Sequence, residues 1–189
     1  MTAVRRLLLI RHGGTTATRR GDFAVDEPLT PQGKIAAAGL ARWASPNTAA
    51  VSSPTRRARE TALAAGWVAA VDDRLAPLDA GLWTGQTLQQ IGLIDPQGMV
   101  RWLSDPAARP HGGETIVELL DRMRGLLAQW HDPAAPDLVA ITHGALIRAA
   151  VVLALGAAPE AFWQVEAAPA SLTELHTRGP RWVLTRVNA

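Results

Sequence analysis

Two short apolar runs in this chain each lead into a histidine followed by a glycine. Leu7–Ile10 precedes Arg11 and the pair His12-Gly13, and Leu138–Ile141 precedes the pair His143-Gly144. A continuous apolar run closed by polar residues is typical of a strand buried on both faces of a parallel sheet. Ligands bind beyond the carboxyl ends of such strands, so we expect both imidazoles to lie over one pocket.

Helical and strand patterns alternate along the rest of the chain. Apolar residues at helical spacing follow Pro31 as far as Trp43, which predicts a helix with Thr30 as its cap and Pro31 in the first position. We also expect strands over 48–51 and 67–71, helices over 55–65, 114–130 and 145–155, and edge strands over 172–175 and 182–187. This alternation predicts an α/β fold, a three-layer α/β/α sandwich whose mainly parallel central sheet has helices on both faces.

The periodicity breaks up between Pro77 and Gly113, where glycine and proline recur at short intervals. A long irregular insertion in a small protein often faces the substrate, so we expect a short cap at about 77–113. At 189 residues, the chain is expected to form a single domain over residues 1–189 that includes this cap.

Charge and composition narrow the class of protein. The formal net charge at pH 7 is only +2, too small for a strong nucleic-acid footprint. Residues 7–10 are too few for a signal-peptide core, and no segment approaches the roughly 20 apolar residues of a membrane span. We therefore expect a cytoplasmic protein that binds neither nucleic acid nor membrane, with its oligomeric state, a homodimer included, left open.

The pair Arg11-His12 is suited to one kind of reaction. A neutral imidazole can attack phosphorus and form a phosphoramidate that water later cleaves. A neighbouring guanidinium can hold the phosphate oxygens. These residues predict phosphoryl transfer, whereas the structural alternative is a strand-end loop with a turn glycine and a hydrogen-bonded histidine.

Several blocks, in order, resemble the histidine phosphatase superfamily, the group that includes cofactor-dependent phosphoglycerate mutases. Leu8–Thr15 is similar to the family signature Arg-His-Gly-x-Thr, with Gly14 where the family commonly has glutamate. Residues 28–33 are similar to the family's Pro-Leu-Thr-x-x-Gly segment. The sequence SSPTRRARETA at 52–62 is similar to the family's Ser-Ser-x-x-x-Arg-Ala-x-x-Thr-Ala. Residues 140–148 resemble its second histidine segment, so the resemblance covers nearly the whole chain.

The resemblance implies a role for each matching residue. His12 would be the phosphorylated nucleophile, while Arg11, Arg57 and His143 would hold the phosphoryl oxygens. Further phosphate or substrate contacts are implied for Gly13, Thr15, Thr18, Gly144, Glu114 and Trp83. No metal and no cofactor are implied.

The chain departs from the family at the proton donor for the leaving group. The family often supplies this proton from a glutamate four residues before the first glycine of Gly-x-Trp-x-Gly, which here begins at Gly81. The aligned residue is Pro77, which cannot donate a proton. We assign Asp79 as the donor and Glu114 as the substitute, although a turn cap explains Asp79 nearly as well and carboxylates such as Glu114 are favoured in the first turn of a helix anyway.

The sequence as a whole predicts a metal-independent phosphomonoesterase that hydrolyses a small phosphorylated metabolite through phosphohistidine on His12. α-Ribazole phosphate, sugar phosphates, phosphoglycerates and phosphoproteins are all compatible substrates. One alternative is a catalytically degenerate member that binds a phosphorylated ligand, motivated by Pro77 and Gly14. Another is a phosphoglycerate mutase-type phosphotransferase, but an abbreviated cap favours hydrolysis because a phosphatase must admit water.

Overall fold

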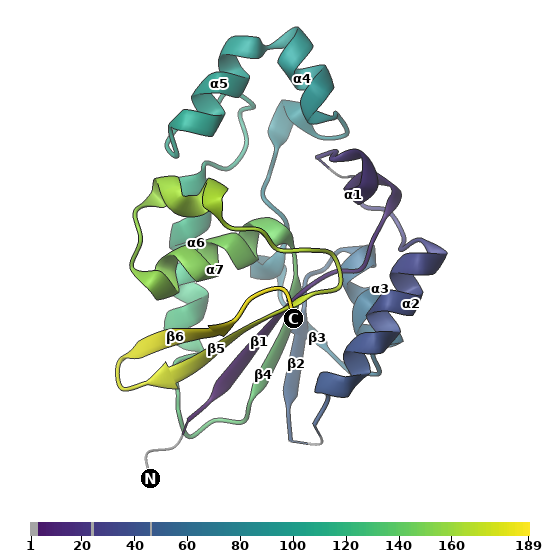
Figure 1. Ribbon diagram of the computed structural model, residues 1–189, viewed down its shortest axis with the longest axis vertical. Coiled ribbons are helices and arrows are strands. Elements are labelled where there is room, and N and C mark those ends of the chain that lie inside the picture. Colours follow the sequence, from purple (N-terminus) through teal and green to yellow (C-terminus); the bar gives the residue numbers. More distant parts are fainter. Residues whose placement is uncertain (1–3, 24, 46) are drawn as a thin grey trace.

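The computed structural model describes residues 4–23, 25–45 and 47–189. In this part of the chain, six strands form one sheet in the order β3-β2-β4-β1-β5-β6 (Figure 1). The strands are β1 (Arg6–Arg11), β2 (Ala49–Ser52), β3 (Ala70–Val71), β4 (Leu138–Thr142), β5 (Leu172–Arg178) and β6 (Arg181–Arg186). The first four run parallel, and β5 and β6 pair in antiparallel fashion. The mainly parallel sheet is therefore confirmed.

Helices cover both faces of this sheet, because β1 and β4 are apolar on both sides. In β1, Leu7 and Leu9 belong to a core cluster with α6 (Ile116–Gln129) and α7 (Gly144–Leu155). The alternate residues, Leu8 and Ile10, pack with Leu40, just after α2 (Pro31–Ala38), and with α3 (Arg56–Ala64). The three-layer α/β/α prediction is confirmed. Among the residues described, no helix is both long and apolar enough to cross a membrane.

The predicted cap region carries α4 (Leu88–Ile94) and α5 (Pro96–Ser104), which stand at one end of the molecule, away from the sheet (Figure 1). Its buried centre consists of Ala80, Trp83, Ile91 and Trp102. Phe23 packs edge-on against Trp102 with ring centroids 5.4 Å apart, and Trp163 does so at 4.2 Å. Aromatic contacts thus attach the cap to two separate segments of the body.

Three local features differ from the sequence-based expectations. Only Ala70–Val71 pair with β2, because Trp67 instead donates its N–H to Ala62 O at the end of α3. The strand expected at an edge over 172–175 lies inside the sheet, between β1 and β6. Its alternating polar residue Glu174 is buried but paired with His176 and Arg186, so the polarity does not mark an exposed face. Helix α1 (Thr16–Arg20) was not expected.

The loop after β1 is pressed against the start of α2. The carbonyl of Gly14 accepts hydrogen bonds from the N–H of Thr30 at 3.0 Å and from its hydroxyl at 3.1 Å. A Cβ on Gly33 would overlap the Gly14 carbonyl and stand 2.9 Å from its nitrogen. At Gly33, the Pro-Leu-Thr-x-x-Gly segment therefore presents bare backbone to the loop that follows His12.

We predict that Gly33→Ala lowers the free energy of unfolding by about 1–3 kcal/mol, because the methyl group has no space between two backbones. The matched control is Gly125→Ala in α6, where a Cβ meets open space and the change should stabilise the helix by up to about 1 kcal/mol. Urea unfolding of the three proteins measures both effects. Equal stability of the two variants would contradict the close approach.

Candidate active site

The pairing of β1 with β4 brings the two histidines together. Arg11 at the end of β1 is in register with Thr142 at the end of β4, so the residues that follow are neighbours. The rings of His12 and His143 lie edge to face with centroids 5.1 Å apart, and each residue is only 4% exposed. The structure thus places both imidazoles in one buried site, as the strand pattern predicts.

Hydrogen bonds fix the tautomer of His12. Its Nδ1 lies 2.8 Å from the carbonyl oxygen of Gly13, which can only accept, so Nδ1 carries the hydrogen. The other nitrogen, Nε2, keeps its lone pair and accepts from Nε of Arg57 at 3.2 Å. Burial first, and then the charges of Arg57 and Arg11, lower the pKa of His12 to about 3. At neutral pH this imidazole is an uncharged base with an available lone pair on Nε2.

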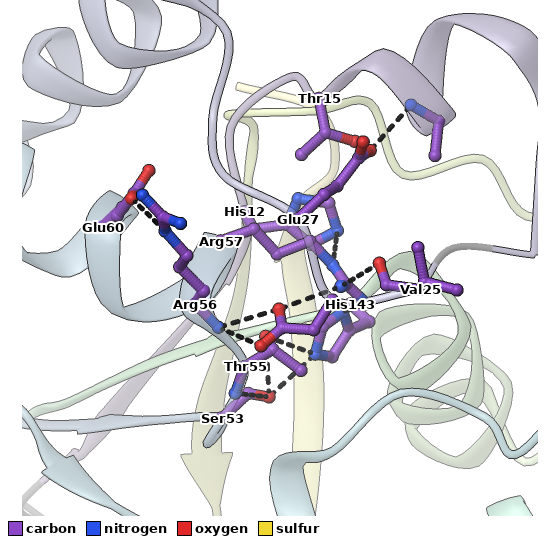
Figure 2. Close-up of polar contacts among 12 residues, drawn as sticks. His12, Thr15, Val25, Glu27, Ser53, Thr55, Arg56, Arg57, Glu60 and His143 are labelled. Atoms are coloured by element: carbon purple, nitrogen blue, oxygen red, sulfur yellow. Dashed lines mark hydrogen bonds and ion pairs between the residues drawn. The ribbon is translucent and has the colours of Figure 1, made fainter.

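Arg57 lies between the two histidines, as Figure 2 shows. It is the second residue of α3, is 2% exposed, and points its Nη2 at Nδ1 of His143 over 3.4 Å. On its far side, Nη1 donates to Val25 O at 3.2 Å and lies 3.5 Å from Asp26 Oδ1. The match to the Arg-Ala-x-x-Thr-Ala segment therefore identifies an arginine that lies within the site.

Ser53 is a member of the site that sequence analysis did not single out. Its buried hydroxyl lies 2.8 Å from Nε2 of His143. Because Arg57 can only donate to Nδ1, the hydrogen of His143 resides on Nε2 and is donated to Ser53 Oγ. The available signal was position, since Ser53 follows β2 directly, at the same edge of the sheet as both histidines.

Arg11 adds a second guanidinium, which is half-buried. Its Nη1 donates to Ala167 O at 2.6 Å, and a Cβ built on Gly144 would lie 3.4 Å from its Nε. Burial, followed by the charges of Arg148 and Arg57, lowers the pKa of Arg11 to about 10, against an opposing effect of Glu166. Like charges held together away from water are unfavourable without a counter-ion, so this cluster suits a bound anion.

The residues expected around the phosphate in the first loop contact α3 and one another. Gly13 donates its N–H to Thr61 Oγ1 at 2.9 Å. Thr15 and Thr18 form a capping box at the start of α1, and the Thr18 hydroxyl donates to Thr15 O at 2.8 Å. These contacts hold the shape of the loop that carries His12.

The remaining candidates are engaged elsewhere, and in the described structure none hydrogen-bonds to either histidine. Glu114 forms a two-point ion pair with Arg122, with distances of 2.8 and 2.6 Å. Asp79 is exposed, and its Oδ1 accepts the N–H of Gly81 at 2.9 Å. Trp83 is buried in the aromatic centre of the cap. Within the described ranges, no three His, Asp or Glu side chains group closely enough to hold a metal ion.

Comparisons with known proteins agree with this geometry. A family model of the histidine phosphatase superfamily (branch 1) matches residues 7–189. Glucosyl-3-phosphoglycerate phosphatase of Mycobacterium tuberculosis is 36% identical over 177 residues, covering 84% of this chain and 78% of that protein. Phosphoserine phosphatase 1 of Hydrogenobacter thermophilus is 27% identical over 197 residues, covering 97% and 92%. The solved structure of a mycobacterial glucosyl-3-phosphoglycerate phosphatase matches with a TM-score of 0.84 and 30% identity, covering 98% and 99% of the two chains.

The electrostatics predict that His12 stays neutral in the free protein at about pH 5, where an imidazole with an unshifted pKa is protonated. Arg57→Gln should raise the pKa of His12, because it removes the largest charge that opposes protonation. The unfolded chain takes up this proton near pH 6.5 and the folded chain only near pH 3, so acidification across that window favours unfolding. Nitrogen NMR shifts of the ring measure the titration, and a His12 pKa near 6.5 in both proteins would refute the effect.

Proposed function

Because this chain is a phosphomonoesterase that belongs to the histidine phosphatase superfamily, we propose that it works in two steps through a phosphoryl group carried on Nε2 of His12. One observation carries this proposal. The Gly13 carbonyl holds the hydrogen of His12 on Nδ1, and Nε2 meets the guanidinium of Arg57 in a buried site. The nucleophilic lone pair and a cation that can bind phosphate oxygens therefore face each other.

In the first step, Nε2 of His12 attacks phosphorus, and the bond from phosphorus to the leaving oxygen breaks with its electron pair on that oxygen. Arg57 turns its Nε–H from the lone pair of His12 to a phosphoryl oxygen. Arg11 contributes a second guanidinium, and the amide of Gly144 at the start of α7 contributes a donor. Fixed donors around the equatorial oxygens stabilise the charge that develops during transfer.

His143 needs a change of tautomer before it can donate to a phosphoryl oxygen. In the free protein its hydrogen is on Nε2, toward Ser53, and burial followed by the nearby His12 and Arg57 holds its pKa well below the usual range. A bound dianion opposes the charge of Arg57 and attracts a proton to Nδ1. The Ser53 hydroxyl can both donate and accept, so it can satisfy Nε2 in either state.

In the second step, water attacks the phosphohistidine, and the bond from phosphorus to nitrogen breaks. The electron pair returns to Nε2, and the proton of the water passes to the inorganic phosphate that leaves. The relatives are named for phosphoserine and glucosyl-3-phosphoglycerate. We take from these names the class of small phosphorylated metabolites rather than a particular compound.

His12→Ala should lower phosphate release by at least about a thousandfold and abolish covalent labelling, because it removes the nucleophile. Arg57→Lys should lower kcat/KM by about a hundredfold, since an ammonium cannot reproduce the fork of the guanidinium. Arg56→Lys is the matched control, because Arg56 is exposed and pairs with Glu60. Rapid acid-free quenching with a phosphorus-labelled aryl phosphate measures labelling and turnover together.

Three results would count against the proposal. Turnover without label on His12 would contradict the covalent step, and equal losses in Arg56→Lys and Arg57→Lys would contradict the assignment of Arg57. Binding of phosphorylated compounds without any release would favour the degenerate alternative. Isomer formation that outruns phosphate release would favour a mutase.

A further inference from the structure

Departure of an alcohol from phosphorus depends on a proton. An alcohol oxygen is a poor leaving group unless an acid protonates it as the bond breaks, and such an acid contributes about 10²- to 10⁴-fold. The resemblance to the histidine phosphatase superfamily implies this acid at the position that Pro77 occupies here. The question is which carboxyl group, if any, has taken over.

Arg122 occupies the neighbourhood of Pro77. Its guanidinium donates to the backbone carbonyls of Arg74 at 2.6 Å, Ala76 at 2.8 Å and Pro77 at 3.4 Å. Its remaining N–H groups bind the two oxygens of Glu114. Because both oxygens of Glu114 already accept from a half-buried cation, protonating this carboxyl would leave the charge of Arg122 without its partner.

Asp79 is held in a turn. Its Oδ1 accepts from Gly81, and its backbone carbonyl accepts from Glu114 N at 2.8 Å. A Cβ on Gly113 would overlap that carbonyl, so the backbone of this turn is tightly packed. The side chain itself is exposed, and in the described structure it hydrogen-bonds to neither His12 nor His143.

The other carboxyl groups around the site face cations or N–H donors. Asp26 accepts from the N–H of Arg56 and lies beside Arg57, and Glu27 accepts from Ala17 N at 2.7 Å (Figure 2). Glu60 binds Arg56 and Leu29 N. Asp22 pairs with Arg20 at 2.6 Å, and Glu166 is exposed near the cation of Arg11. Of the 189 residues, the five outside the described ranges (1–3, 24 and 46) carry no carboxyl side chain.

From these contacts we infer that the enzyme prefers phosphoryl compounds whose leaving group departs as an anion. These are enol and aryl phosphates among the monoesters, and acyl phosphates and phosphoanhydrides beyond them. This inference rests on the proposed function. The bond from Nε2 of His12 to phosphorus forms, the bond to the leaving oxygen breaks, and a carboxylate, phosphate, enolate or phenolate departs without a proton from the protein. The relatives' names specify phosphates on alcohol oxygens, so the substrates inferred here differ from theirs in the leaving group.

The experiment compares para-nitrophenyl, phenyl and benzyl phosphate, which differ mainly in the acidity of the leaving group. It measures kcat/KM, because this parameter reports the first step even when hydrolysis of phosphohistidine limits turnover. In the wild type, kcat/KM should fall steeply along the series, with benzyl at least about a hundredfold below phenyl. Acetyl phosphate should be hydrolysed at least as well as the para-nitrophenyl compound.

Pro77→Glu should raise kcat/KM for benzyl phosphate by about a hundredfold and leave the para-nitrophenyl compound little changed, because it supplies the missing acid. Pro77→Gln is the matched control, similar in size but unable to act as an acid, and should show no gain. If either variant fails to fold, the wild-type series still decides.

A wild-type series that is flat from para-nitrophenyl to benzyl, with label on His12, would overturn the inference while the proposed function stands. Absence of His12-dependent label with every compound, acetyl phosphate included, would instead overturn the proposed function. The two failures are thus distinguishable.

Discussion

The site depends on the parallel register between β1 and β4. Arg11 opposite Thr142 puts His12 and His143, which are 131 positions apart, at the same sheet edge. Both strands are apolar on both faces, so burial under two helical layers fixes the register. The path of the loop after β1 is also fixed, because Gly13 and Gly33 let this loop lie directly against the start of α2.

A buried excess of positive charge gives this geometry its chemistry. Arg11 and Arg57 oppose protonation of both imidazoles, and burial acts in the same direction. In the proposed mechanism, the same charges that keep the imidazole of His12 neutral attract a phosphate dianion, which in turn relieves their mutual repulsion. This coupling would let the guanidinium of Arg57 serve both the free and the bound states.

The sequence predicts the parts of the structure that depend on local pattern. The double-sided apolar runs specify the inner strands, and the spacing of Arg-Ala-x-x-Thr-Ala selects Arg57 rather than Arg56. It does not reveal Ser53, because only the fold brings that hydroxyl to His143. Nor does it reveal that Arg122 engages Glu114, since the pairing of a helix residue with the loop before that helix has no sequence signature. The proton donor for the leaving group is the hardest feature to predict from the sequence, because the role of a carboxyl group depends on its partners and exposure rather than on residue type.

The central claim is that His12, His143, Arg11 and Arg57 act on one phosphorus atom. A crystal structure of the protein with vanadate, which adopts the geometry of the transferring phosphoryl group, tests this most directly. The account predicts vanadium bonded to Nε2 of His12, with its oxygens in contact with both guanidinium groups and the ring of His143. Vanadate bound away from Nε2, or contacting only one of the two histidines, would contradict it.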